Sequence, residues 1–434
     1  METDNDKHWA KFFKSSNALA EIKTDGFTYI TAKELKAAGG REPRLMAKID
    51  SLSNRPSAFK EHGINILPVQ NGRYILFKDS QNSSFYRFKT SEENRQIEEY
   101  ISNKDLQAFD SFPADRLFSS ESQAIDFAHI ASLLTSYSQE ENLQLTVRGR
   151  LRSGEFSFVL PQSKHLVEVA NVQIEVDAGY ETADSLLLLE AKIGRRDDFN
   201  IRQLWYPWMQ WSQKTTKKIR PIFFSYSNGQ YLFTEFKFDT IFGSIVVIDN
   251  RVFTINESAI AHINLHQVLA ESQQGIRIQN YTIPQANDID KVVDLIQFVK
   301  DGQNSRPKIA ECFEFDERQA DYYANAAGYL GLLERSEKGK RSEFQLTPFG
   351  REFLGLKLRS QRTKALVKQM ATDPLMHEAF QSLQSKSFND NLVSDKEIAT
   401  LIEKHSKLKG KTPIRRASTI KSWLRWLIKN ARFS

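Results

Sequence analysis

The sequence predicts an α/β or α+β fold built from three consecutive blocks. In the middle of the chain, strand-like runs alternate with helix-like segments, which is the pattern of a sheet covered by helices. On either side, helix-like segments precede a short hairpin. A chain of 434 residues usually exceeds what one hydrophobic core supports. We therefore expect three domains, at residues 1–115, 116–285 and 286–434.

Composition limits the classes of function. Hydrophobic residues make up 40% and charged residues 26% of the chain, as in ordinary globular proteins. No run approaches about 18 apolar residues, and the opening METDNDKHWAKFF lacks a signal-peptide core. We expect a cytoplasmic protein with no membrane partner. The single cysteine, Cys312, excludes an intrachain disulfide and a cysteine-rich zinc site. The net charge of +6 is compatible with a polyanionic partner.

The first block combines a helix with a hairpin. ITAKELKAAG, residues 30–39, is helix-like, and ILPVQNGRYILFK, residues 66–78, places Asn71-Gly72 between two apolar strands, a common hairpin turn. This pattern predicts a small winged-helix-like unit. Its basic residues predict a phosphate-binding surface: Arg41, Arg44, Lys48 and Arg55.

The second block predicts the central sheet. Apolar residues recur at helical spacing over residues 121–137. The expected strands cover residues 143–151, 155–160, 165–176, 185–193, 219–227, 230–238 and 244–249. Between them, DFNIRQLWYPWMQW, residues 198–211, predicts a helix that Pro207 disturbs. Its aromatic cluster is more typical of packing than of base stacking.

The third block predicts a second winged-helix-like unit. Residues 288–300 and 316–333 read as helices, the latter with Asp316 as its N-cap. A hairpin with a basic tip at 338–341 follows. A last helix within residues 407–429 has an apolar stripe of Ile420, Trp423, Leu424 and Leu427, which leaves Lys421 and Arg425 on its other side.

The run LLLLEAKIG, residues 186–194, carries the candidate chemistry. Strand alternation places Glu190 and Lys192 on one face, at the end of a buried strand. If the upstream strand, which carries Gln173, Glu175 and Asp177 on one face, pairs with it through ETADS, then Asp177 approaches Glu190. Two carboxylates beside a lysine suit Mg²⁺ and the hydrolysis of a phosphodiester. In that case Asp177 and Glu190 would hold the metal, and Lys192 would position the attacking water or stabilise the developing charge. The alternative is that the charges are exposed or paired at a strand end.

This motif resembles the active site of the PD-(D/E)xK nuclease superfamily, with Asp177 followed by Glu190-Ala191-Lys192 and with Val176 in place of the proline. The resemblance implies a central mixed sheet flanked by helices, Mg²⁺ as cofactor, and a further acidic residue from the preceding helix, Glu121 or Asp126. Residues 145–235 resemble type II restriction endonucleases in particular. That resemblance implies double-stranded DNA as substrate, a homodimer, and a cognate DNA methyltransferase in the same system, with the winged-helix-like blocks as accessory DNA-binding units.

Further polar residues are candidates for support or DNA contact. Gln173 and Gln203 are candidate supporting residues, and Arg202 a candidate contact to the cleaved strand. Arg148, Arg150 and Arg152 share a strand face, where phosphate contact and carboxylate pairing are both open. In the third block, one helix face could read bases or be merely solvated, and it carries Arg318, Gln319, Tyr322 and Asn325. Basic residues near the C-terminus are assigned to phosphates: Arg415, Arg416, Lys421 and Arg425.

The sequence therefore predicts a Mg²⁺-dependent, sequence-specific endodeoxyribonuclease. Two alternatives remain open. One is a non-catalytic DNA-binding regulator in which Glu190 and Lys192 are structural. The other is a nuclease specific for modified, damaged or branched DNA.

Overall fold

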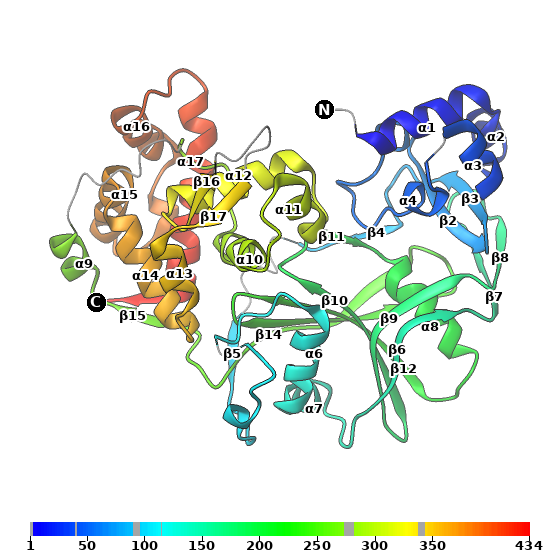
Figure 1. Ribbon diagram of the computed structural model, residues 1–434, viewed down its shortest axis with the longest axis horizontal. Coiled ribbons are helices and arrows are strands. Elements are labelled where there is room, and N and C mark those ends of the chain that lie inside the picture. The colour runs from blue at the N-terminus through cyan, green and yellow to red at the C-terminus, as the bar shows by residue number, and fades with distance from the viewer. Residues whose placement is uncertain (1–2, 40, 90–95, 114, 273–281, 337–342) are drawn as a thin grey trace.

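The computed structural model describes residues 3–39, 41–89, 96–113, 115–272, 282–336 and 343–434. The chain forms a mixed α/β fold with a large mixed sheet, which confirms the predicted class. In Figure 1 the N-terminal helices and the C-terminal helices lie on opposite sides of the molecule, with the large sheet below and between them. Within the described residues, the helices are too short or too polar to cross a bilayer.

The N-terminal part is a small helical layer on a three-stranded antiparallel sheet of order β1-β3-β2. Its helices are α1 (Asp4–Ser15), α2 (Ala18–Asp25), α3 (Ala32–Gly39), α4 (Pro43–Met46) and α5 (Ser57–His62). Its strands are β1 (Phe27–Thr31), β2 (Ile64–Gln70) and β3 (Arg73–Lys78). The predicted turn at Asn71-Gly72 is confirmed, and Gly72 takes φ 72°, which favours glycine. Trp9 and Phe59 are fully buried in its core.

One basic residue of this part was expected at the surface and is not there. Arg55 is only 5% exposed, because its guanidinium donates to the carbonyls of Phe59 and Ile64 inside the unit. A buried guanidinium needs such acceptors, so Arg55 has a structural role.

The central sheet has seven strands in the order β5-β14-β13-β12-β10-β9-β6. The strands are β5 (Ile97–Tyr100), β6 (Gln144–Arg152), β9 (Gln173–Glu181), β10 (Ser185–Ile193), β12 (Lys218–Ser227), β13 (Gln230–Phe238) and β14 (Ile245–Ile255). β10 runs parallel to β12 and β5 runs parallel to β14, while the other neighbours are antiparallel. Two short pairs lie beside the sheet, β4 (Phe85–Arg87) with β11 (Asp198–Asn200), and β7 (Glu155–Val159) with β8 (Leu166–Ala170).

Helices cover both faces of β10, which explains its apolar sequence. On one face Leu187 and Leu189 join the core beneath α6 (Glu121–Ile130) and α7 (Leu133–Ser138). On the other face Leu186 and Leu188 form a small cluster with Trp211 of α8 (Arg202–Ser212). Every residue of β10 is buried, which confirms that both faces are covered, and the separation of these leucines into two clusters confirms the predicted alternation.

Pro207 does not interrupt α8, contrary to the expectation from sequence. The helix continues to Ser212, and the proline ring is buried in it. Packing of Trp205, Tyr206 and Met209 against the sheet outweighs the cost of an internal proline, which is about 3 kcal/mol.

The C-terminal part is mainly helical. Its helices are α9 (Leu265–Glu271), α10 (Ile289–Lys300), α11 (Arg306–Phe313), α12 (Glu317–Tyr329), α13 (Pro348–Leu354), α14 (Arg359–Ala371), α15 (Pro374–Ser385), α16 (Asp395–His405) and α17 (Thr412–Asn430). Short 3₁₀ helices are η2 (Leu106–Ala108) in the preceding segment and η3 (Asp390–Leu392) here. Its strand pairs are β15 (Ala261–Ile263) with β18 (Ala431–Phe433), and β16 (Leu333–Ser336) with β17 (Glu343–Leu346). The predicted N-cap is confirmed, because the Asp316 carboxylate accepts the backbone N–H groups of Arg318 and Gln319. The predicted basic tip at 338–341 lies outside the described residues.

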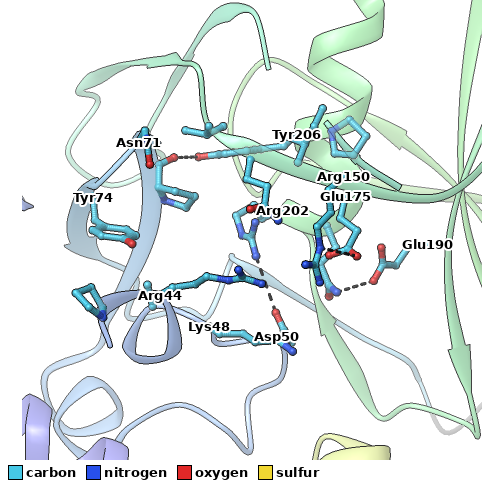
Figure 2. Close-up of a pocket in the computed structure, with 18 of the residues that line it drawn as sticks. Arg44, Lys48, Asp50, Asn71, Tyr74, Arg150, Glu175, Glu190, Arg202 and Tyr206 are labelled. Atoms are coloured by element: carbon cyan, nitrogen blue, oxygen red, sulfur yellow. Dashed lines mark hydrogen bonds and ion pairs between the residues drawn. The ribbon is translucent and has the colours of Figure 1, made fainter. Parts of the chain in front are cut away.

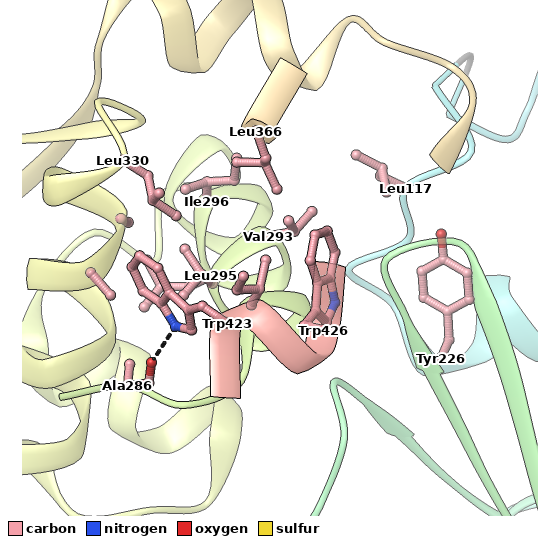
Figure 3. Packing of buried hydrophobic residues seen from close by; sticks show 14 of the residues in the cluster. Leu117, Tyr226, Ala286, Val293, Leu295, Ile296, Leu330, Leu366, Trp423 and Trp426 are labelled. Atoms are coloured by element: carbon pink, nitrogen blue, oxygen red, sulfur yellow. Dashed lines mark hydrogen bonds between the residues drawn. The ribbon is translucent and has the colours of Figure 1, made fainter. Parts of the chain in front are cut away.

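The C-terminal part shares its hydrophobic core with the α6 face of the sheet. The predicted apolar stripe of α17 is buried, and Figure 3 shows Trp423 and Trp426 against Val293 and Ile296 of α10. Trp423 Nε1 donates to the carbonyl of Ala286 over 2.8 Å. This continuous core holds the C-terminal part against the end of the sheet.

Candidate active site

The sheet opens between β9 and β10. Their pairing runs from Leu186↔Glu181 to Leu189↔Ala178 and stops there. Asp177 is the next residue of β9, and its Oδ2 accepts the backbone N–H of Ala191 over 2.7 Å. A side chain thus takes the hydrogen bond that the ladder would otherwise make. On the other edge of β9, the register with β6 shifts between Val147 and Gly149, and such a bulge bends a strand.

The opening forms one wall of a pocket of 630 Å³, which we call the fork pocket. The central part of the chain contributes these lining residues: Glu121, Gln173, Glu175, Asp177, Glu190, Lys192 and Gln203. The N-terminal part contributes Arg44, Lys48, Asp50, Asn71 and Tyr74 to its lining, and the C-terminal part contributes Glu314. Figure 2 shows Arg44 and Lys48 reaching into the pocket from the side opposite Arg150 and Glu190. Residues from all three parts of the chain therefore surround one space.

Glu190 and Lys192 form the buried floor of the fork pocket. They are 5% and 6% exposed. Glu190 Oε1 accepts a hydrogen bond from Lys192 Nζ over 2.7 Å and another from Gln203 Nε2 over 2.5 Å. The alternative that the two charges are exposed at the strand end is therefore wrong, whereas the alternative that they pair with each other is confirmed. A pair that is buried needs further partners to offset desolvation, and α8 supplies one through Gln203.

Burial and mutual repulsion raise the carboxylate pKa values of the pocket. Burial raises the pKa of Asp177 to about 6, with Glu121 adding to the effect and Lys192 opposing it. Burial also raises the pKa of Glu190 to about 8 despite the neighbouring Lys192. For Lys192, burial would lower the pKa, but the surrounding carboxylates hold it well above its usual value. The site thus gathers more negative than positive groups, which is the electrostatic setting of a cation site.

Two acidic residues outside the strands complete this setting. Glu121 lies in the first turn of α6 and lines the pocket, and burial raises its pKa. Asp126 does not line the pocket, and its carboxylate forms an ion pair with Arg148 at 2.5 Å. Glu314 was not predicted from sequence, and its Oε1 lies 3.7 Å from Lys192 Nζ. Burial would raise the pKa of Glu314, but Lys192, Arg196 and Lys48 lower it.

The donor set fits a divalent cation that keeps part of its water shell. Asp177 Oδ1 and Glu190 Oε2 accept no hydrogen bond from the described residues. Gln203 Oε1 and Glu314 Oε2 are buried without a partner there. In the described ranges, no three His, Cys, Asp or Glu side chains gather as a complete metal cage. Mg²⁺ does not require one, since it commonly takes one or two carboxylates and fills its shell with water and phosphate oxygens.

The predicted arginines separate into different environments. Arg148 Nε donates to the carbonyl of Asp177 over 3.0 Å, so it supports the strand beside the site. Arg150 pairs with Glu175 at 3.3 Å and lines the pocket. Arg202, also in the lining, lies 3.9 Å from Asp50. Arg152 lies opposite Gln173 in the register and is exposed.

The candidates of the C-terminal part lie together on α12 and α17. Arg318 Nε donates to the Tyr322 hydroxyl over 2.5 Å, and Arg335 donates to Asn325. Gln319 is partly exposed on the same helix. Arg415 is exposed and Arg416 is half-buried, with electrostatic coupling to Tyr322.

The remaining two basic candidates of α17 are paired with acidic neighbours. Lys421 pairs with Asp395 at 3.1 Å and Arg425 with Asp390 at 2.8 Å. These candidates are not part of the fork pocket.

Three family models match consecutive segments of the chain. Residues 6–76 match a domain of unknown function (DUF6996), residues 80–254 match a second (DUF6997), and residues 291–432 match a third (DUF7226). No curated protein and no solved structure matches the chain. The family descriptions carry no activity, so the functional argument rests on the fork pocket itself.

Proposed function

We propose that the protein is a Mg²⁺-dependent endodeoxyribonuclease that hydrolyses phosphodiester bonds of double-stranded DNA, resembling type II restriction enzymes of the PD-(D/E)xK superfamily. The observation that carries the proposal is the opening of β9 from β10, which brings Asp177, Glu190 and Lys192 to one buried wall of an accessible pocket. The two carboxylates and the lysine come from neighbouring strands, as the sequence motif predicts.

Each residue at the opening has a chemical task in this proposal. Asp177 and Glu190 would hold the cation through the oxygen atoms that have no protein donor. When bound, Mg²⁺ would polarise the phosphate and lower the pKa of a bound water. Gln203 keeps the Glu190 carboxylate oriented. The Lys192 ammonium donates a hydrogen bond to the attacking water, or it stabilises the negative charge that develops on the phosphate oxygens.

The lining of the pocket supports a nucleic-acid strand as ligand. Cationic side chains reach its space from two sides, Arg44 and Lys48 from the N-terminal part, and Arg150 and Arg202 from the central part. Cations on opposite walls suit phosphates on both sides of a scissile bond. A small uncharged substrate would not need them.

The flanking parts support duplex DNA rather than a mononucleotide. Two helices followed by a hairpin are the order of elements in a winged helix, and the C-terminal part has this order in α11, α12, β16 and β17. The expected base-reading residues lie on α12. We propose that this unit and the N-terminal helix-hairpin unit grip the duplex on either side of the fork pocket. A homodimer would then place two such pockets on the two strands of a palindromic site.

The proposal is tested by incubating purified protein with unmodified and with methylated phage DNA, in Mg²⁺ or in a chelator, and sequencing the ends. Discrete fragments that require Mg²⁺ support the proposal and give the site of cleavage. Cleavage of methylated DNA alone would identify a modification-dependent nuclease. Intact DNA in every reaction, with a gel shift on duplex, would refute catalysis in favour of a DNA-binding regulator.

A further inference from the structure

Glu314 occupies a backbone position that a glutamate rarely takes. It follows α11 as its C-cap, with φ 56° and ψ 36°, in the left-handed region. Glycine is the usual residue there, because a Cβ makes that conformation costly, and asparagine follows because its short polar side chain can hydrogen-bond locally. A glutamate in this place indicates that its side chain, and not the turn alone, is required.

Contacts from the other two parts of the chain fix this position. The carbonyl of Glu314 accepts the hydroxyls of Ser51 over 2.8 Å and Ser53 over 3.0 Å, both from the N-terminal part. Arg196, just after β10, donates to the carbonyl of Cys312 over 2.9 Å. Gly194 is close to the Phe313 ring, since a Cβ there would lie 2.8 Å from it. The segment that carries Glu314 is thus held by the loop after β10 and by the loop after α4.

The side chain of Glu314 points to the catalytic lysine of the proposed reaction. Its Oε1 lies 3.7 Å from Lys192 Nζ, which is also 2.7 Å from Glu190 Oε1. Its side chain is 18% exposed, and Oε2 is buried without a partner in the described part of the chain. The Lys192 ammonium is therefore held between a carboxylate of its own strand and a carboxylate of the C-terminal part.

We propose that Glu314 is a positioning residue for Lys192, so that the active site is complete only when the C-terminal part is seated against the central sheet. This inference rests on the proposed nuclease function for its consequence, but not for the contact itself. The Glu314 carboxylate attracts the ammonium across 3.7 Å from the C-terminal part, while Glu190 holds it by a hydrogen bond of 2.7 Å. Without Glu314 this second attraction is lost, and the hydrogen bond to Glu190 alone sets the position of the ammonium.

Glu314 also lies close in sequence to the helix that carries the predicted base-reading residues. Asp316, the N-cap of α12, is two residues beyond Glu314, and α12 carries Arg318 and Gln319.

The first test compares Glu314→Gln with Glu311→Gln, an exposed glutamate on α11 that does not line the fork pocket. We expect Glu314→Gln to lower the single-turnover cleavage rate at saturating protein by about 10- to 100-fold, as for a misplaced catalytic group. Its Kd for duplex DNA, measured with Ca²⁺ in place of Mg²⁺, stays unchanged, and Glu311→Gln matches the wild type in both. Wild-type cleavage by Glu314→Gln would overturn the positioning role.

The second test needs no activity. Thermal midpoints are measured for Lys192→Met, Glu314→Gln and the double variant. Direct interaction predicts that Glu314→Gln is less destabilising in the Lys192→Met background, because the carboxylate would otherwise be left without its cation. Strictly additive shifts would overturn the inference. If the wild type cleaves no DNA but the midpoint shifts are not additive, the nuclease proposal fails, whereas the positioning of Lys192 by Glu314 stands.

Discussion

Asp177 Oδ2 accepts the backbone N–H of Ala191 at 2.7 Å, at the first position where β9 and β10 no longer pair. This contact fixes the carboxylate of one strand beside Glu190 and Lys192 of the next. It also determines which carboxylate oxygen faces the pocket, since Oδ2 is occupied.

Gln203→Ala should raise the Mg²⁺ concentration that cleavage requires. Gln203 Nε2 donates to Glu190 Oε1, and loss of a residue that orients a metal ligand typically costs about 10- to 100-fold in metal affinity. The measurement is the Mg²⁺ concentration that gives half-maximal cleavage. Gln213→Ala, an exposed glutamine just after α8, is the control and should leave that concentration unchanged. An equal shift in both variants would mean that Gln203 does not act through Glu190.

The Mg²⁺-free protein should lose stability as pH rises. Burial raises the folded-state pKa of Glu190 from 4.5 to about 8 and that of Asp177 from 3.8 to about 6. Between the unfolded and folded values the folded state binds more protons, so the free energy of unfolding falls as pH increases from about 4 to 8. Thermal midpoints in a chelator, for wild type and Glu190→Gln, measure this. As pH rises across that range, the thermal midpoint of the wild type should fall relative to that of Glu190→Gln. Addition of Mg²⁺ should raise the midpoint of the wild type most at pH 8. A constant difference would contradict the raised pKa of Glu190.

Much of this arrangement could be predicted from the sequence, because it depends on local patterns. The apolar run before Glu190 predicted a strand buried on both faces, and the alternation placed Lys192 beside Glu190. The resemblance to the PD-(D/E)xK nucleases, and not a local pattern, led us to expect Gln203 and either Glu121 or Asp126 near the site, and of these Gln203 and Glu121 line the pocket.

The rest depends on contacts between distant segments. Glu314 reaches Lys192 from another part of the chain, and no spacing in the sequence indicates that. Arg148 and Arg150 form ion pairs with Asp126 and Glu175, which is one of the two alternatives that the sequence left open, and only the folded chain decides between them. Arg55 is buried by carbonyl acceptors that only the folded unit supplies.

Arg44→Ala should weaken DNA binding without a change in sequence preference. Arg44 is exposed and lines the fork pocket, so we assign it to a phosphate. Loss of one phosphate contact reduces the slope of log Kd against log salt by about 1. Fluorescence anisotropy over a salt series, with Ca²⁺ present, gives the slope. Lys11→Ala, exposed on α1 and not in the pocket lining, is the control. An unchanged slope in Arg44→Ala would remove the N-terminal part from the proposed interface.

Arg359→Met should destabilise the junction of the central and C-terminal parts. Arg359 and Asp290 are 0% and 2% exposed and lie 2.8 Å apart within the C-terminal part, and Arg359 Nη1 donates to the carbonyl of Asn228 in the central part over 2.7 Å. Removal of one partner leaves a buried charge, which typically costs about 3–5 kcal/mol. Urea unfolding measures the loss, and Arg415→Met on the exposed face of α17 should change the unfolding free energy by less than about 0.5 kcal/mol. A comparable change in both variants would show that the buried pair contributes little.

Asp177, Glu190 and Lys192 form the proposed Mg²⁺-dependent hydrolytic site. The decisive variant is Lys192→Met, with single-turnover cleavage of duplex DNA in Mg²⁺ and binding of the same duplex in Ca²⁺ measured on one preparation. We expect cleavage to fall by at least about 10²- to 10³-fold, as for loss of a group that stabilises developing charge, while the Kd for duplex DNA stays near the wild-type value. Cleavage by Lys192→Met at the wild-type rate would contradict the claim and move the site elsewhere in the chain.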